Sequence, residues 1–146
     1  VYSIRTLINI KDQEKQEKAL KELIRVAKRG ICFILIECCV EGITNLNRIR
    51  RKFNIKGLKT VWYNRFFKKK ELEDILEQNG VKILKRTYFP VITILEKVIY
   101  PKLKKVHGVS RLFHVVYFIL YFVDKNLCRY FPPLGYDFIY VCRKCG

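Results

Sequence analysis

Two apolar stretches of the chain carry side chains that could bind a ligand or move a proton. Residues 1–10 contain Ser3 and Arg5 within an apolar run, and residues 30–37 end at Glu37. A carboxylate such as Glu37 can orient or deprotonate a hydroxyl or amine. If both stretches are parallel strands, these side chains lie at one edge of a sheet, where open α/β sheets bind their ligands.

Each of these side chains also has a purely structural explanation. Ser3 could be only a polar group at a strand end, and Arg5 could pair with a carboxylate such as Glu37. Glu37 itself could cap a helix or pair with an arginine. The residues alone leave these alternatives open.

Cysteines and histidines give little support to a metal site. Cys142 and Cys145 form a single CxxC without a second ligand pair at matching spacing, and His107 and His114 are isolated, so we expect no metal. Several cysteines fall in or beside apolar runs, where a free thiol behaves as a small apolar side chain. Without a recognisable secretory segment, we expect a reducing cytoplasmic setting. The six cysteines are Cys32, Cys38, Cys39, Cys128, Cys142 and Cys145.

The apolar spacing predicts the elements that would hold the candidate residues. A helix over about residues 13–28, with Asp12 as its N-cap, joins the first strand to a second over residues 31–36. This arrangement is a βαβ unit, with parallel strands and a right-handed crossover. The second strand is almost continuously apolar, which predicts that both faces of its sheet are covered.

The later pattern predicts two helices, over residues 45–53 and 70–79, and two strands, over residues 81–89 and 136–141. An irregular aromatic stretch over residues 59–67 contains the only tryptophan. Residues 90–133 depart from a minimal α/β pattern, with a helix over 91–106 interrupted at Pro101 and a nearly all-apolar segment over 109–123. Fifteen helical residues span about 22 Å, less than the roughly 30 Å of a bilayer core, so burial is favoured over membrane contact.

Composition leaves several partner classes open. The chain has 146 residues, 50% of them apolar, which suits one domain with a substantial core. Its formal charge is +17, and residues 42–70 include ten basic residues and no acidic one. Nucleic acid, anionic lipid or an acidic substrate would explain this charge, and so would biased codon usage. Because the chain opens in a buried-type strand, we expect a piece of a longer protein.

The order of the predicted strands and helices, together with several short sequence motifs, resembles the second half of a class I S-adenosylmethionine-dependent methyltransferase of a bacterial methyltransferase-domain type. The matching segments are residues 3–10, 16–20, 25–30, 33–37, 42–47 and 62–64. The family's usual Pro and second Gly ahead of strand five are Arg29 and Ile31 here. The resemblance implies a Rossmann-like α/β sheet with strands in the order 4-5-7-6 and strand seven antiparallel.

The resemblance treats residues 1–146 as one partial methyltransferase domain. Strands four to six would lie in residues 1–89, a helical insertion in 90–133 and the last strand in 134–146. Strands one to three are not matched, and in the family they carry the glycine-rich loop and the acidic residue that hold the cofactor. We therefore expect the chain by itself to bind cofactor weakly or not at all.

Site roles follow from the same resemblance. S-adenosylmethionine would be the cofactor, contacted by Ser3, Ile4 and Arg5 at the exit of strand four. Glu37 would be the catalytic residue that orients or deprotonates the methyl acceptor. The acceptor would be a small molecule or a glycan- or lipid-linked group. Its side of the site would be lined by Asn45, Asn47, Trp62, Tyr63 and Asn64.

Two other classes of function compete with methyl transfer. A basic non-catalytic module could bind RNA or an anionic membrane through Arg48, Arg50, Arg51 and Lys52. A scaffold could instead dock a partner on the apolar face of residues 112–123. For the methyltransferase we expect a small-molecule or glycan/lipid-linked acceptor, with nucleic acid disfavoured. A homodimer through residues 90–133 and peripheral membrane contact of a cytoplasmic protein stay open.

Overall fold

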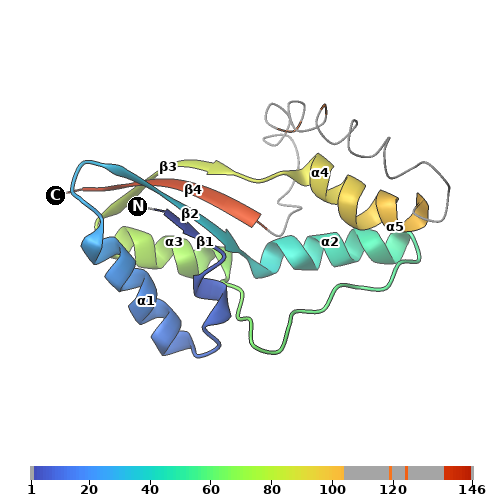
Figure 1. Ribbon diagram of the computed structural model, residues 1–146, viewed down its shortest axis with the longest axis horizontal. Coiled ribbons are helices and arrows are strands. Elements are labelled where there is room, and N and C mark those ends of the chain that lie inside the picture. Colours follow the sequence, from blue (N-terminus) through green and yellow to red (C-terminus); the bar gives the residue numbers. More distant parts are fainter. Residues whose placement is uncertain (1, 104–118, 120–123, 125–136, 146) are drawn as a thin grey trace. The chain divides into compact units, whose positions relative to one another are not determined.

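The computed structural model describes residues 2–103, 119, 124 and 137–145 (Figure 1). The chain divides into two compact units, which are described separately. The first, here called the sheet unit, comprises Val1–Glu41, Lys59–Arg86 and Asp137–Gly146. The second, the helical unit, comprises Gly42–Leu58 and Thr87–Tyr136.

The sheet unit is built on four strands, β1 (Tyr2–Ile4), β2 (Cys32–Cys38), β3 (Val81–Thr87) and β4 (Asp137–Lys144). Their order is β1-β2-β4-β3, so the last strand of the chain lies between β2 and β3 (Figure 1). β1 runs parallel to β2, and β4 runs antiparallel to β2. The described elements are therefore mixed α/β, and the strand order corresponds to the one that the resemblance implies.

The connection from β1 to β2 follows the predicted βαβ pattern with shorter elements. β1 ends at Ile4, a 3₁₀ turn (Leu7–Asn9) follows, and α1 covers Gln13–Val26. As predicted, Asp12 caps α1, because its Oδ1 accepts a hydrogen bond from the Lys15 amide at 2.8 Å. The helix ends two residues before the predicted Lys28, and Gly30 turns the chain towards β2 at a φ of 73°.

The prediction that both faces of β2 are covered is wrong for the described residues. Phe33 and Leu35 are buried, whereas the alternate residues Cys32 and Ile34 are exposed. α1 and α3 (Lys69–Gln78) pack on the buried face, on which Tyr140 of β4 also lies. Figure 1 shows both helices on the same side of the sheet. The continuous apolar run therefore has one core face rather than two.

Two predicted boundaries differ from the structure, the first because β2 passes almost directly into a helix. α2 covers Val40–Lys52, not residues 45–53, and it begins just after a bridge between Cys39 and Phe67. Glu41 accepts hydrogen bonds from the Lys69 amide at 3.0 Å, which ties the end of the first sheet-unit segment to the start of α3. β3 ends at Thr87, two residues before its predicted end.

The predicted interruption at Pro101 is also wrong. In the helical unit α4 (Pro90–Ile94), a π-helical turn (Leu95–Ile99) and α5 (Tyr100–Leu103) follow one another without a break. Pro101 has no amide hydrogen for the Lys97 carbonyl four residues earlier. Arg50 of α2 donates to that carbonyl instead, so a buried guanidinium compensates for the missing helical hydrogen bond.

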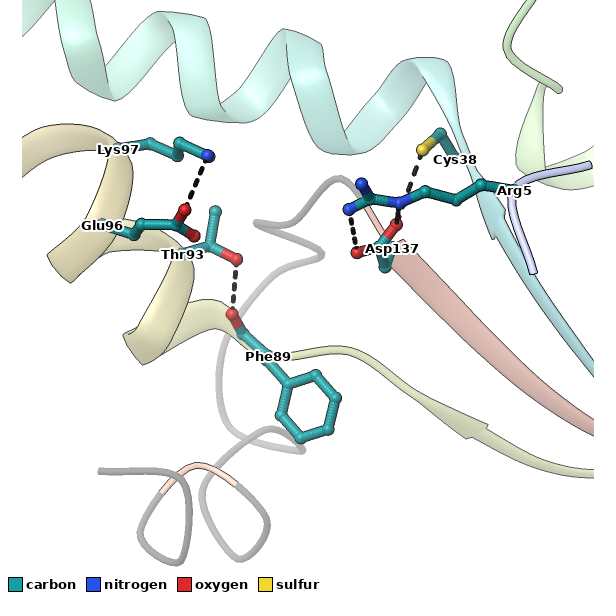
Figure 2. Close-up of polar contacts among 7 residues, drawn as sticks. All are labelled: Arg5, Cys38, Phe89, Thr93, Glu96, Lys97 and Asp137. Atoms are coloured by element: carbon teal, nitrogen blue, oxygen red, sulfur yellow. Dashed lines mark hydrogen bonds and ion pairs between the residues drawn. The ribbon is translucent and has the colours of Figure 1, made fainter. Parts of the chain in front are cut away.

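Side chains also fix the start of α4. The Asp124 carboxylate accepts hydrogen bonds from the Val91 and Ile92 amides at 3.1 and 2.9 Å, which satisfies two of the first amides of the helix. Within the same helix the Thr93 hydroxyl donates to the Phe89 carbonyl at 2.6 Å, drawn in Figure 2. The helical unit is thus held by polar contacts to helix ends.

The predicted apolar segment over 109–123 lies outside the described residues except for Ile119, and His107, His114 and Cys128 lie outside them too. In the part of the chain that is described, no helix is both long enough and apolar enough to cross a bilayer.

Arg50 provides a test of the helical unit. Its Nε and Nη2 donate to the Lys56 carbonyl at 2.9 and 2.8 Å, in addition to the bond with Lys97. Arg50→Met keeps a long side chain but removes these donors. We expect it to lower the free energy of unfolding by about 1.5–3 kcal/mol. Urea unfolding followed by circular dichroism measures this change. Arg51→Met, at the exposed neighbouring position, is the matched control and should change stability by less than about 0.5 kcal/mol.

Candidate functional site

The strand ends that were predicted to form a ligand edge lie side by side in the sheet unit. β1 and β2 both end there and the antiparallel β4 begins there, so Arg5, Cys38 and Asp137 come together from three strands. The backbone of Arg5 still follows β2, because its amide donates to the Ile36 carbonyl at 2.7 Å. Carboxyl ends of parallel strands are the usual place for a ligand in an α/β sheet. This edge is therefore the candidate site.

Glu37, the predicted catalytic residue, is fully buried at this edge. Its Oε1 accepts hydrogen bonds from the Ser3 hydroxyl at 3.0 Å and from the Leu7 amide at 3.3 Å. Its Oε2 has no hydrogen-bond partner among the described residues. The carboxylate thus holds the end of β1 and the start of the 3₁₀ turn, which is the capping role that the sequence left open. A role as base stays a prediction.

Burial sets the protonation behaviour of Glu37. Removal of the carboxyl from water raises its pKa above the ordinary value of 4.5, and the hydrogen bonds from Ser3 and Leu7 offset part of that rise. A carboxyl in this position favours its neutral form more than an exposed glutamate does. This property suits either a structural carboxyl or a general acid–base group, so it does not by itself choose between the two roles.

Arg5 pairs with Asp137, not with Glu37 (Figure 2). The guanidinium makes a two-pronged contact, Nε to Oδ1 at 2.7 Å and Nη2 to Oδ2 at 2.5 Å. Cys38 lies beside it with its Sγ 3.6 Å from Asp137 Oδ1. Burial, reinforced by the Asp137 charge, raises the pKa of this thiol to about 12, so Cys38 is not a nucleophile at neutral pH.

Asp137 is the functional candidate that the sequence reasoning missed. It lies 132 residues from Arg5, and only the antiparallel return of β4 places it opposite Cys38. The one available signal was its position at the start of an apolar strand. By contrast, Ser3, Ile4 and Arg5 lie where they were predicted: Ser3 is buried against Glu37, whereas Ile4 and Arg5 are exposed.

A polar network fixes the loop that leaves this edge. The buried amide of Gln16 donates to the carbonyls of Leu7 and Arg65, at 3.0 and 2.8 Å. Arg65 donates back to the Gln16 side chain and reaches Glu71 of α3 at 2.7 Å. The turn after β1, helices α1 and α3 and the aromatic stretch before α3 are therefore joined through two side chains.

The predicted acceptor residues of the aromatic stretch are mostly exposed. Trp62 and Tyr63 pack edge to face on one another, with ring centroids 5.6 Å apart, and 78% of Trp62 is accessible. Asn64 is partly buried, and its Oδ1 has no hydrogen-bond partner among the described residues. These three residues belong to the sheet unit, so a ligand at its surface could reach them.

The other two predicted acceptor residues belong to the helical unit. Asn47 uses both ends of its amide on the backbone of Leu58, donating to the carbonyl at 2.9 Å and accepting from the amide at 2.7 Å. This pairing closes the turn after α2, and Gly57 passes close to the same amide. Asn45 lies two residues earlier in α2 and is partly buried. A structural role accounts for Asn47, and acceptor binding by this pair stays a prediction.

The described cysteines are free thiols, and the buried ones are kept protonated. Burial raises the pKa of Cys142 to about 12 and that of Cys39 further. Among the described residues, no three His, Cys, Asp or Glu side chains are grouped so that they could hold a metal ion. Comparison with known proteins adds no family: no protein-family model matches the chain, and no curated protein is significantly similar to it.

The raised pKa of Glu37 predicts a pH-dependent stability. Unfolded Glu37 loses its proton near 4.5, whereas the folded residue keeps it to higher pH, so its contribution is complete below 4.5 and is lost as the pH rises through the raised pKa. Glu37→Gln cannot ionise, and it should gain stability relative to the native chain between pH 4 and pH 8. Urea midpoints across this range measure the difference, with Glu14→Gln as an exposed control. A difference that does not change with pH would contradict the prediction.

Proposed function

We propose that the chain is part of a class I S-adenosylmethionine-dependent methyltransferase domain. The observation that supports this most is the strand order β1-β2-β4-β3, with β4 antiparallel to β2. It corresponds to the 4-5-7-6 order that the sequence resemblance implies. An antiparallel strand inserted beside a parallel pair is unusual enough to favour this class over a simple doubly wound sheet.

The open side of β1 is consistent with a larger sheet. β1 is at the end of the described strand order, so no described strand lies along its outer edge. The unpaired backbone groups of a strand edge are usually paired or otherwise protected in native proteins. In the proposed domain, strands one to three and their glycine-rich loop occupy this side.

The strand-end residues would form one wall of the cofactor site. Ile4 offers an exposed apolar side chain, and the neighbouring Arg5 offers a half-exposed guanidinium oriented by Asp137. This combination fits a ligand that has both a flat base and a carboxylate, as S-adenosylmethionine has. Ser3 and Glu37 would not contact the cofactor; their hydrogen bonds would position the backbone from which Ile4 and Arg5 project.

Methyl transfer makes modest chemical demands on these residues. When bound, S-adenosylmethionine supplies an electrophilic methyl group, and the protein contributes mainly orientation. A base is needed only for an acceptor that must lose a proton. Glu37 would take that role only if its Oε2 became accessible to the acceptor; in the described conformation we assign it to positioning. The acceptor, a small molecule or a glycan- or lipid-linked group, would lie against Asn64, Trp62 and Tyr63.

Cofactor binding tests the proposal directly. Isothermal titration calorimetry of S-adenosylmethionine with the protein expressed from its complete gene should show binding. Arg5→Ala should weaken it about tenfold or more, because a hydrogen bond to a charged group is worth about 1.5–3 kcal/mol.

Arg25→Ala is the matched control, since Arg25 is also an exposed arginine paired with a carboxylate, Glu22, at 2.8 Å. It lies on α1, away from the strand ends, and should leave the affinity unchanged. Absence of binding by the folded protein, or equal weakening by both variants, would refute the cofactor site.

A further inference from the structure

Three consecutive residues before α3 place apolar surface in solvent. Val61, Trp62 and Tyr63 are 45%, 78% and 44% exposed, and Trp62 is the only tryptophan in the chain. Single exposed apolar residues are ordinary, but a contiguous exposed patch that includes an indole marks an interaction surface. These three residues are called the aromatic loop below.

The aromatic loop is held in shape rather than left to collapse onto the core. The Asn64 amide donates to the Val61 carbonyl at 2.9 Å, which closes a tight turn around the two aromatic residues. The next amide, that of Arg65, donates to the Ile8 carbonyl at 2.9 Å and anchors the turn to the sheet unit. The edge-to-face packing of Trp62 and Tyr63 fixes the two rings relative to one another.

Two lysines lie near this apolar surface, one in space and one in sequence. The Lys11 ammonium lies 5.6 Å from the centre of the Trp62 ring, and Lys59 is exposed just before the loop. The carboxylate next to Lys11 in sequence, Asp12, is occupied in capping α1. Residues 42–70 contain no acidic side chain, within a chain of formal charge +17. The occupant of this surface should therefore be anionic as well as apolar.

We propose that the aromatic loop docks on an anionic lipid surface. Tyrosine and tryptophan favour the boundary between headgroups and acyl chains, because each joins an apolar ring to a polar tip. Val61 would enter the apolar layer beside them, and Lys11 and Lys59 would lie at the level of the lipid phosphates. This proposal does not depend on methyl transfer.

Single-stranded RNA fits the same surface less well. Bases stack on open aromatic faces, one after another along the strand. The rings of Trp62 and Tyr63 are perpendicular, at 85°, and Lys11 lies over one face of the indole. Two bases cannot stack in series on such a pair, and the aliphatic side chain of Val61 contributes nothing to base stacking.

The single tryptophan makes a direct test available. Vesicles of phosphatidylserine and phosphatidylcholine, added to the chain at low salt, should shift Trp62 emission to shorter wavelength, and brominated acyl chains should quench it. Vesicles of phosphatidylcholine alone should have a weaker effect, and added salt should reverse binding. Binding to the mixed vesicles without a change in Trp62 emission would overturn the proposal, as would a response to single-stranded RNA but not to vesicles.

Sedimentation with vesicles compares the variants. Trp62→Ala combined with Tyr63→Ala should lower partitioning about tenfold or more, because it removes most of the buried apolar area. Lys11→Gln should lower it about fivefold. Val26→Ala and Lys28→Gln, at exposed positions near the end of α1, are matched controls and should partition like the native chain. Equal partitioning of the loop variants and the controls, with folding verified by circular dichroism, would refute the docking site.

Discussion

The buried carboxylate of Glu37 is the contact on which the candidate site depends. It lies at the end of β2 and binds two groups of the neighbouring segment, the hydroxyl of Ser3 and the amide of Leu7. Those bonds set where β1 stops and how the chain turns towards α1. Arg5, with a φ of 48°, projects from the intervening bend. Removing this carboxyl group from water is costly, and the hydrogen bonds that join it to the two segments offset part of that cost.

Polar side chains, as well as the apolar core, connect the segments of the sheet unit beyond this contact. Gln16 joins the turn after β1 to Arg65, and Arg65 reaches Glu71 on α3. The aromatic stretch is therefore anchored at Arg65, while the rings of Trp62 and Tyr63 are exposed to solvent. A buried polar side chain has the same role in the helical unit. There the guanidinium of Arg50 donates hydrogen bonds to the backbone carbonyls of Lys56 and Lys97. In both units a buried polar side chain fixes irregular backbone, because an unpaired backbone group away from water is costly.

Much of the framework could be predicted from local patterns. The cap at Asp12, the amphipathic helices around Leu20 and Leu72, and the parallel β1–β2 pair all follow from spacing of apolar residues and turn chemistry. Covering of both faces of β2 and the break at Pro101 were predicted wrongly. The first error arose because a continuous apolar run does not reveal whether both faces of the strand are packed. The second arose because Arg50, 51 residues earlier, compensates for Pro101.

The sequence by itself determined the element types, the strand ends that carry Ser3, Arg5 and Glu37, and the excess of positive charge. These are local properties, since periodicity, capping and composition are set by residues close together in the chain. Only the tertiary structure decided the partners: Asp137 for Arg5, the Ser3 hydroxyl for Glu37 and the Leu58 backbone for Asn47. It also decided that Glu37 is buried and Trp62 exposed. Pairing and burial depend on which distant segments meet, and the antiparallel return of β4 across the sheet has no local signature.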